Sequence, residues 1–578
     1  MLLAFAASAS GAARLYAPIY GSSSPSEPER IAVFDRGPDG SLTPAAGSPF
    51  AAYPGPPFAV RGLVNIGFAP DGARAVGGFL SDGGVQGYSI GASGAVVPTN
   101  SIAAHQTENV AVSPDGRFAY IATREYPPGS GTEGIRAFAL GPDGSVSPIG
   151  SPVDSTTSFG NEIAITPDGR FLYALDGISI RRFAIAADGT LTPAGSTMVG
   201  GIGYLVVDPG GRFLFGGLSG PAGVVSFAIA ADGSLSQVGE PALTGGAGGD
   251  YPSVSPDGGY LYLPDANEDK IAIVAVAPDG GVREVGSMPA VNAEATAVSP
   301  DNRFVYWFQG SGGEAIRVAA IGPGGGLSPL PFVAPYEAYQ TVHPVFQPGP
   351  APVASFTAKA AAPGTEASFD AAKSTNATRY DWDFGDGTTL ANGGPKPTHA
   401  YAKAGRYTVT LSLTDEQGCG ARQIYTGQST TCPGGAGTTK ALAVDTLPVI
   451  GKVKATPTKF LPQGVAAKGK AGTKLRVKLN EAAKIQVKIE RRLPGRKVGR
   501  KCKKPTPGNA SKKKCSRYLT QGSRIKKDGK GGWNEIAFGG KLKGKPLAPG
   551  GYRITAVATD SAQGRSAPRS AAFRVLGY

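Results

Sequence analysis

The sequence predicts an all-β protein, with a seven-bladed β-propeller followed by two immunoglobulin-like β-sandwich domains. The first observation behind this prediction is composition: 86 Gly and 49 Pro accompany frequent aromatic and β-branched residues, which favours many short strands joined by tight turns. The second observation is that two kinds of turn alternate along the first 349 residues. The third is that no long stretch has the apolar periodicity of a helix.

The first kind of turn joins an apolar strand to an aromatic one. Its copies are FAPDGARAV from Phe68, VSPDGRFAYIA from Val112, ITPDGRFLYAL from Ile165, VDPGGRFLFGG from Val207, VSPDGGYLYLP from Val254, VSPDNRFVYWF from Val298 and a degenerate HPVFQPG from His343. The turn prolines are 42 to 53 residues apart. This period is typical of propeller blades.

The second kind of turn lies between the copies of the first and also occurs seven times. Its copies are GPDGSLTP from Gly37, GASGAVVP from Gly91, GPDGSVSP from Gly141, AADGTLTP from Ala186, AADGSLSQ from Ala230, APDGGVRE from Ala277 and GPGGGLSP from Gly322. Pro fixes φ, Asp bonds the backbone and Gly accepts a positive φ, so the motif suits a tight turn. Two hairpin turns in each repeat give four strands, which is one blade.

Seven copies of the second turn predict seven blades, with six as the alternative. Because the last copy of the first turn is incomplete, we expect the N- and C-terminal strands to share one blade, with RLYAPIY from Arg14 supplying the missing part. The paired PDGRFxY and PDGSL turns resemble the lactonase family of seven-bladed propellers, which contains 6-phosphogluconolactonase. The resemblance covers about residues 14–349 and implies a propeller domain there.

The resemblance also implies hydrolysis of a sugar lactone, but the residues that members use differ here. The family places His and Arg in stretches such as C-H-x-A and G-P-R-H, whereas the matching positions hold Asp250-Tyr251 and Glu294-Ala295. At such a position this chain retains His343, preceded by Val342 rather than Arg. We therefore expect a binding protein rather than an enzyme, with a lactone hydrolase as the alternative, and we assign no catalytic residue.

The start of each inner strand should line the rim of the central channel. The predicted rim residues are Asn65, Glu108, Asn109, Asn161, Glu162, Tyr204, Asp250, Tyr251, Glu294 and His343, with His105 nearby as a surface residue. These residues indicate either a ligand site, in which clustered carboxylates bind Ca²⁺ or act as an acid/base pair, or a hydrated polar funnel. We predict no bound metal or cofactor, and Ca²⁺ is the one ion left open.

Residues 350–446 form the second predicted domain. The run from Tyr380 to Thr388, His399-Ala400-Tyr401 and the run from Gly405 to Val409 closely resemble the PKD domain, an immunoglobulin-like sandwich common in extracellular proteins. Trp382 and Phe384 alternate with aspartates, so the two aromatic rings should face the core. The Asp-Gly pair at 386–387 predicts a turn.

Residues 447–578 form a basic β domain with 33 Lys and Arg against five Asp and Glu, a net charge of +28, whereas residues 1–349 carry −14. The stretch LAPGGYRITAVATD looks like the last hairpin of an immunoglobulin-like sandwich, and the domain resembles those at the C-termini of secreted actinobacterial proteins. The charge is either a solvated face or a site for an anionic cell-wall polymer or polysaccharide, with Lys503, Lys504, Lys512, Lys513 and Lys514 as candidate contacts. Specific nucleic-acid recognition is not favoured because no stacking aromatics accompany the charge.

Four cysteines fall in two local pairs, which predict the disulfides Cys419–Cys432 and Cys502–Cys515. Residues 1–13 have the apolar and small-residue composition of a signal peptide, although no basic residue precedes Arg14. No apolar run of about 18 residues follows, so no transmembrane segment is predicted. These features indicate a secreted protein, held at the cell surface if the basic domain binds there. A protein or carbohydrate ligand on the propeller face is a further expectation.

Overall fold

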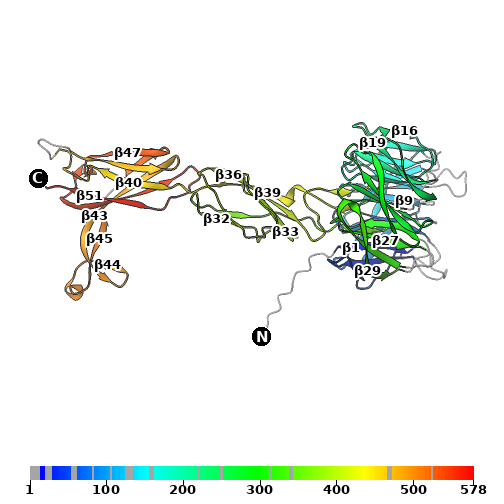
Figure 1. The fold of residues 1–578 in the computed structure, drawn as a ribbon, viewed down its shortest axis with the longest axis horizontal. Helices are drawn as coiled ribbons and strands as arrows, with labels where there is room; N and C mark the ends of the chain where they lie inside the picture. The colour runs from blue at the N-terminus through cyan, green and yellow to red at the C-terminus, as the bar shows by residue number, and fades with distance from the viewer. Residues whose placement is uncertain are drawn as a thin grey trace. The chain divides into compact units, whose positions relative to one another are not determined.

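The computed structural model describes residues 13–19, 29–53, 62–80, 84–103, 107–123, 134–154, 162–218, 221–247, 251–310, 315–336, 343–464, 471–521 and 525–577. Within these ranges the regular structure consists of strands and three short 3₁₀ turns (Figure 1). The three turns are η1 (Pro323–Gly325), η2 (Ala436–Thr438) and η3 (Pro507–Asn509). The predicted signal-peptide segment, 1–13, lies almost wholly outside the described residues.

The chain divides by its internal contacts into two compact units. The first comprises Met1–Val353, Thr375–Arg379 and Ser412–Thr439, and the second comprises Ala354–Ser374, Tyr380–Leu411 and Lys440–Tyr578. The propeller unit therefore includes two segments from the PKD-like stretch of the sequence. One of these segments, Ser412–Thr439, contains the Cys419–Cys432 disulfide.

Seven antiparallel sheets form the propeller, and each has four strand positions (Figure 1). Six of the sheets, each in order from its inner strand, are β5 (Leu63–Phe68), β6 (Arg74–Phe79), β7 (Val85–Ile90) and β8 (Val96–Ile102); β9 (Thr107–Val112), β10 (Phe118–Thr123), β11 (Gly134–Leu140) and β12 (Val146–Val153); β13 (Ile163–Ile165), β14 (Phe171–Leu175), β15 (Ser179–Ile185) and β16 (Leu191–Met198); β17 (Ile202–Val207), β18 (Phe213–Leu218), β19 (Pro221–Ile229) and the divided outer strand β20 (Leu235–Gln237) and β21 (Ala242–Ala247); β22 (Ser253–Val254), β23 (Tyr260–Asp265), β24 (Lys270–Val276) and β25 (Val282–Pro289); and β26 (Ala293–Val298), β27 (Phe304–Gln309), β28 (Ala315–Ile321) and β29 (Leu327–Pro335).

The seventh sheet joins the two ends of the propeller sequence. Its inner strand is β30 (Val345–Phe346), which pairs with β1 (Arg14–Ile19); β1 pairs with β2 (Arg30–Arg36), and the outer position is shared by β3 (Leu42–Pro44) and β4 (Phe50–Ala51). The prediction of seven blades and of one shared closing blade is confirmed. Closure removes free sheet edges around the ring, which stabilises the propeller against unravelling.

The repeated turn and aromatic residues hold neighbouring blades together. In the turn after β2, the Asp39 carboxylate accepts hydrogen bonds from the backbone N–H and hydroxyl of Ser41, at 3.1 and 2.7 Å, and Gly40 has φ of +90°. The Tyr306 hydroxyl of the preceding blade donates to the Gly40 carbonyl at 2.8 Å, and the Phe304 ring packs against the same glycine. Tyrosines at the equivalent position make this contact at four further junctions, Tyr16–Gly94, Tyr120–Gly189, Tyr173–Gly233 and Tyr262–Gly325. The Phe-x-Tyr of the repeat is therefore an interblade contact.

The PKD-like part of the second unit has two small sheets around an aromatic core. One sheet has the order β31 (Thr357–Lys359), β32 (Glu366–Asp370), β35 (Thr398–Ala400), and the other has the order β34 (Thr389–Leu390), β33 (Arg379–Asp383), β36 (Arg406–Thr414), β39 (Thr439–Asp445). Trp382 and Phe384 are both buried and pack against Phe369, so the predicted core aromatics are confirmed. Gly387 has φ of +91°, and Thr388 donates to the Asp386 carboxylate in the predicted turn.

The basic C-terminal domain is also a two-sheet sandwich. Its smaller sheet has the order β40 (Ile450–Thr456), β42 (Thr473–Leu479), β47 (Gly532–Phe538). The larger has the order β41 (Lys459–Phe460), β51 (Arg569–Val575), β50 (Gly550–Thr559), β43 (Ala483–Val498), and three short strands also pair with β43, namely β44 (Lys501–Lys503), β45 (Lys514–Thr520) and β46 (Ile525–Gly529). The strands β48 (Lys541–Leu542) and β49 (Lys545–Pro546) form a separate hairpin. Apolar side chains of both large sheets form one core, which includes Leu475, Ile485, Ile554 and Phe573.

Strand β43 extends past the sandwich and carries a projecting hairpin with β44 and β45 (Figure 1). We call residues 491–521 the arm. The Cys502–Cys515 disulfide lies within the arm, and Cys419–Cys432 lies in the other unit, so both predicted pairings are confirmed. No helix in the described part of the chain is long and apolar enough to cross a membrane.

Candidate functional site

The starts of the inner strands bring part of the predicted polar rim together. Asn65 lies on β5 and Asn109 on β9, Glu162 precedes β13, and His343 forms an isolated parallel bridge with Asn65. Asn65, Asn109 and Glu162 are fully buried, while the His343 side chain is 23% exposed. The repeat therefore places these four side chains, from four blades, around one point of the channel.

These four side chains form a hydrogen-bonded network. His343 Nε2 lies 2.9 Å from Glu162 Oε1 and 3.5 Å from Asn109 Nδ2, and Asn65 Nδ2 donates to Asn109 Oδ1 at 2.8 Å. Burial raises the pKa of the Glu162 carboxyl, and the hydrogen bonds and charge of its neighbours offset this only in part. A buried carboxyl paired with a partly exposed imidazole is a possible proton donor and acceptor pair.

Aromatic rings border the exposed side of His343. The Tyr251 ring meets the His343 ring edge to face at 4.0 Å, and the Tyr204 ring lies 4.8 Å from Tyr251. Glu294 is half-buried and packs over Gly310, where any side chain would collide with its carboxylate. Glu294 is thus placed on β26 of the next blade, outside the hydrogen bonds that link Glu162 and His343.

The remaining rim predictions fall on residues that the structure does not describe. Asn161, Asp250 and His105 lie outside the described ranges, as does the side chain of Glu108. Among the residues that are described, no group of three or more His, Cys, Asp or Glu is arranged to hold a metal ion. The Ca²⁺ expectation for the rim therefore has no structural support in the described part of the channel.

A hairpin from the PKD-like sequence occupies the channel, which sequence reasoning missed. It consists of β37 (Ile424–Tyr425), β38 (Thr430–Cys432) and the four residues between them. Its tip caps the last residue of four successive inner strands. Phe68 N–H donates to Ser429 Oγ, Val112 N–H to the Gln428 carbonyl, Ile165 N–H to the Gly427 carbonyl and Val207 N–H to the Thr426 carbonyl.

Two hairpin side chains extend these backbone contacts. Gln428 Nε2 lies within hydrogen-bond distance of Glu162 Oε2, at 3.1 Å, and of the carbonyls of Ile163 and Leu205. Tyr425 is fully buried in the core of the third and fourth blades, and its hydroxyl donates to the Val112 carbonyl at 2.8 Å. The hairpin therefore joins the candidate site to the propeller core.

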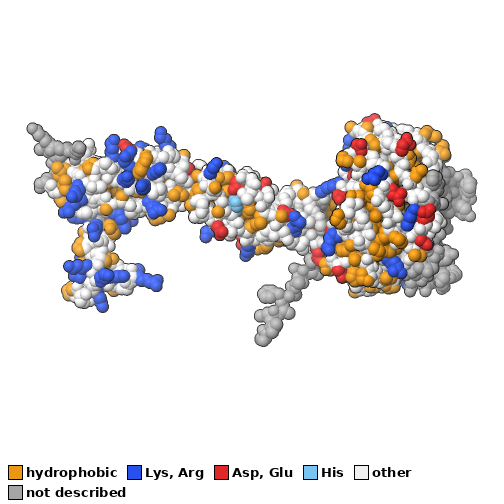
Figure 2. All heavy atoms as spheres, viewed as in Figure 1, with side chains coloured by type: hydrophobic (Ala, Val, Ile, Leu, Met, Phe, Trp, Pro, Cys, Tyr) orange, Lys and Arg blue, Asp and Glu red, His pale blue; other side chains and the backbone are white. Residues whose placement is uncertain are grey.

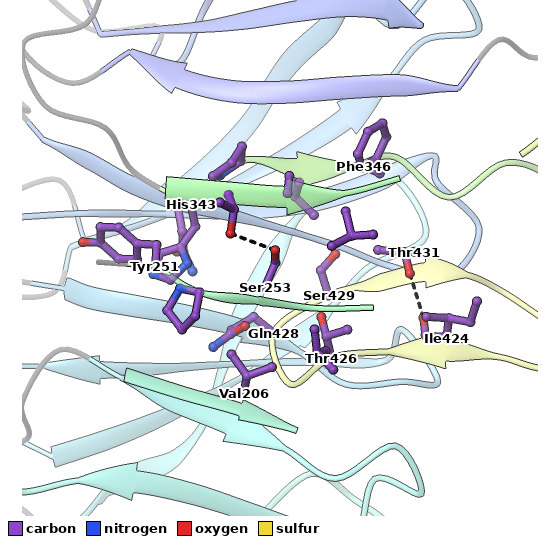
Figure 3. Close-up of a pocket in the computed structure, with 18 of the residues that line it drawn as sticks. Val206, Tyr251, Ser253, His343, Phe346, Ile424, Thr426, Gln428, Ser429 and Thr431 are labelled. Atoms are coloured by element: carbon purple, nitrogen blue, oxygen red, sulfur yellow. Dashed lines mark hydrogen bonds between the residues drawn. The ribbon is translucent and has the colours of Figure 1, made fainter. Parts of the chain in front are cut away.

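The hairpin leaves one small cavity beside its tip, with a volume of about 100 Å³. Figure 3 shows Thr426 and Gln428 of the hairpin on one side, and His343, Ser253 and Phe346 of the blades around the rest. The last residues of the three other inner strands, Val254, Val298 and Phe346, line this cavity. This face of the channel is thus closed to anything larger than a few solvent molecules.

The base of the hairpin is fixed by two buried groups. The Cys419–Cys432 disulfide has both sulfur-bearing residues almost fully buried. Asp415 Oδ1 accepts hydrogen bonds from the backbone N–H of Gln417 and Cys419. Burial raises the pKa of the Asp415 carboxyl to about 6. No repeated motif accompanies this segment; the local cysteine pair was its one sequence signal.

The second candidate site is the arm, where the sequence placed the polymer contacts. Residues 491–521 contain twelve Lys and Arg and no Asp or Glu. Lys503, Lys504, Lys512, Lys513 and Lys514 are all exposed, and basic side chains cover the arm in Figure 2. The ion pairs of the described residues include none with a cation of the arm, so its charge is uncompensated by carboxylates. The disulfide and the pairing of β43 with β45 hold these cations on one projection.

Comparison with known proteins gives a domain assignment and general fold likenesses. Residues 349–427 match the family model of the PKD domain. A 45-residue stretch is 49% identical to a microbial collagenase of Vibrio alginolyticus, a match that spans 8% of this chain and 5% of the collagenase.

Two solved structures resemble the propeller part of the chain. A candidate 6-phosphogluconolactonase from Bacteroides uniformis is 19% identical, with a TM-score of 0.48, over 58% of this chain and 99% of its own. A periplasmic gluconolactonase from Pseudomonas aeruginosa is 22% identical, with a TM-score of 0.46, over 58% of this chain and 99% of its own. The fold and the PKD domain are thus shown, and the activity is left to the site itself.

Proposed function

We propose that the protein is a secreted binding protein that attaches to anionic surface polymers through its basic C-terminal domain. The observation that carries the proposal is the arm, which holds twelve cations and no carboxylate on a disulfide-linked projection. Charge beyond the needs of solubility, gathered on one element, attracts polyanions through many weak contacts. Two buried or half-buried disulfides and a PKD-type domain support an oxidising, extracellular location.

Retention on an anionic polymer measures this function directly. The full chain is passed over immobilised polygalacturonate at rising salt, beside a variant with Lys503, Lys504, Lys512, Lys513 and Lys514 all changed to Gln. We expect elution of the native protein to need several-fold more salt, because the Debye length falls from about 10 Å at 0.1 M to about 3 Å at 1 M. Equal elution of the two proteins, or retention that ignores salt, would reject the proposal.

A lactone hydrolase is the second candidate function, and the Glu162–His343 pair is the observation that favours it. Against it stand the hairpin that closes one face of the channel and the bond between Gln428 and the same carboxylate. We therefore expect no hydrolysis of 6-phosphogluconolactone above the uncatalysed rate. Turnover that is lost in both His343→Ala and Glu162→Gln would establish the enzyme instead.

A further inference from the structure

A groove lies at the base of the arm, on the outer face of the larger sheet of the C-terminal domain. Its volume is about 770 Å³, within the range of ligand sites. Four cations from four strands line it, Lys459 on β41, Arg574 on β51, Arg492 on β43 and Lys514 on β45. No Asp or Glu lines it, and among the described residues none of these four cations has a carboxylate partner within ion-pair distance.

Strand register sets these cations in a row. Lys459 and Arg574 are partners on adjacent parallel strands, and Arg574 is the partner of Gly551 on the next strand. The missing side chain of Gly551 opens the floor, because a Cβ there would lie 3.8 Å from the Arg492 Cβ. Since strands are about 4.8 Å apart, the row from Lys459 to Arg492 spans about 14 Å. That length suits several units of an extended chain crossing the strands.

The walls and floor of the groove define the chemistry of the occupant. Arg492 Nε donates to Ser516 Oγ at 2.8 Å, which fixes a guanidinium whose remaining N–H groups suit a carboxylate or phosphate. Gly551, Pro494 and Ala572 give a smooth, non-aromatic floor, on which the C–H faces of sugar rings can pack. The two aromatic residues of the lining, Tyr552 and Phe573, are buried, so no ring is available to stack a nucleobase.

The nearest acidic residue on β43 is already neutralised. Glu490 accepts from Lys488 at 2.8 Å and from Arg553 at 2.8 Å, on the part of the strand next to the groove. The groove therefore keeps its full positive charge. Its concave form also distinguishes it from the arm tip, where Lys512 and Lys513 are exposed on a projection.

We propose that this groove is the seat of an anionic glycan chain, whose carboxylates or phosphodiesters pair with Arg492 and Arg574. The inference rests on the proposed function and adds the place and the chemical class of the ligand. The arm gathers the polymer by its field, and the groove binds a short stretch of it by contact. The groove should thus bind oligomers too short to benefit from the arm.

The test uses the full chain and defined oligomers at 0.15 M salt: a galacturonic acid hexamer, a glycerol-phosphate hexamer, a neutral glucose hexamer and a 12-nucleotide single-stranded DNA. The groove variant is Arg492→Gln with Arg574→Gln, and the control of equal charge change is Lys512→Gln with Lys513→Gln. We expect the groove variant to weaken binding of the anionic hexamers at least 10-fold, and the control to weaken it less than 3-fold. The two anionic hexamers tell carboxylate from phosphodiester recognition, and the glucose hexamer should not bind.

Gly551→Phe tests the groove at constant charge, because it fills the floor in ordinary backbone geometry. It should abolish hexamer binding and leave retention on long polymer unchanged. Equal losses in the groove and arm-tip variants, or unaltered binding in Gly551→Phe, would overturn the proposal. Tighter binding of DNA through the same arginines would overturn the glycan class. Failure of the native protein to be retained on long polymer at low salt would instead reject the proposed function itself.

Discussion

The Gln428 side-chain amide lies within hydrogen-bond distance of the Glu162 carboxylate, Nε2 to Oε2 at 3.1 Å, although 266 residues separate them. The contact joins a hairpin tip to a buried carboxyl inside the channel, and the carbonyl of the same Gln428 accepts from Val112 N–H. One residue thus links the backbone cap of the inner strands to the polar network around His343. Its removal should be felt at both places.

Gln428→Ala should loosen the hairpin tip. It leaves the buried Glu162 carboxylate short of a donor, which costs about 1–3 kcal/mol. Amide exchange of Val112, Ile165 and Val207, followed by NMR or mass spectrometry, should accelerate accordingly. Gln428→Glu should accelerate it further at pH 7 and less at pH 5, because two carboxyls then face one another. Gln521→Ala, on the arm, is the control and should leave these amides unchanged. Unchanged protection in Gln428→Ala would show that the side chain does not hold the tip.

The two disulfides should differ in reactivity. Cys419 and Cys432 are almost fully buried, whereas Cys502 and Cys515 are half-buried. Mild reductant under native conditions should therefore open Cys502–Cys515 first, as measured by alkylation and peptide mapping. Replacing Cys419 and Cys432 together with Ser should weaken the hairpin by about 3 kcal/mol for its short loop and raise exchange at Ile165. The matched Cys502 and Cys515 replacement should not affect Ile165. Reduction of the buried pair first would contradict this order.

Stability of the hairpin base should depend on pH through Asp415. Its carboxyl has a pKa of about 6 in the folded protein against an ordinary value of 3.8, so ionisation opposes folding. A group with a raised folded pKa favours folding below its unfolded value and loses that contribution as pH rises to about 6.

Asp415→Asn keeps the acceptor oxygen and should raise the free energy of unfolding by about 1–3 kcal/mol at pH 8, an upper figure because the site is partly solvated. The gain should vanish below about pH 4. Asp39→Asn should show the opposite sign, because the Ser41 hydrogen bonds hold the pKa of Asp39 below its usual value. Urea unfolding at pH 4, 6 and 8 measures both. An Asp415→Asn effect of equal size at all three would contradict the assignment.

The interblade contact at Gly40 should resist substitution for two separable reasons. A Cβ at Gly40 would lie 2.7 Å from the Phe304 ring, and φ is +90°. Gly150 has φ of +62° with nothing within 4 Å, so Gly150→Ala isolates the backbone term at about 1–2 kcal/mol. Gly40→Ala should cost about 1–3 kcal/mol more, and Tyr306→Phe about 1 kcal/mol for its lost hydrogen bond. Scanning calorimetry of the propeller transition measures all three. Equal losses in the two glycine variants would show that ring packing contributes nothing.

The propeller was predictable from sequence because its determinants are local and repeated. Asp39 and Gly40 form their turn within five residues, and the shared spacing carried His343 and Asn65 to the channel without knowledge of any distant contact. Tyr306 was visible as part of the repeat, but its bond to Gly40 was not, because the partner lies on the next blade, 266 residues away.

The candidate site was predictable only in part, for the same reason. The ring position of Glu162 followed from the repeat, yet its burial depends on Gln428, which belongs to a segment that occurs once. A single hairpin with no periodic copy offers no pattern from which its partner can be inferred. The arm lay between these cases: its charge was plain in the sequence, whereas the groove at its base exists only through the register of β41, β51 and β50.

The segment Ser412–Thr439 has a consequence for the ancestry of the chain. A family boundary drawn by similarity falls near residue 349, but the inner strands of four blades end on atoms supplied from beyond residue 425. A genetic exchange that replaced everything after residue 349 would leave Val112, Ile165 and Val207 without their acceptors and the Tyr425 position in the propeller core empty. The propeller and the stretch that follows it therefore descend as one heritable unit, although they look like separate modules.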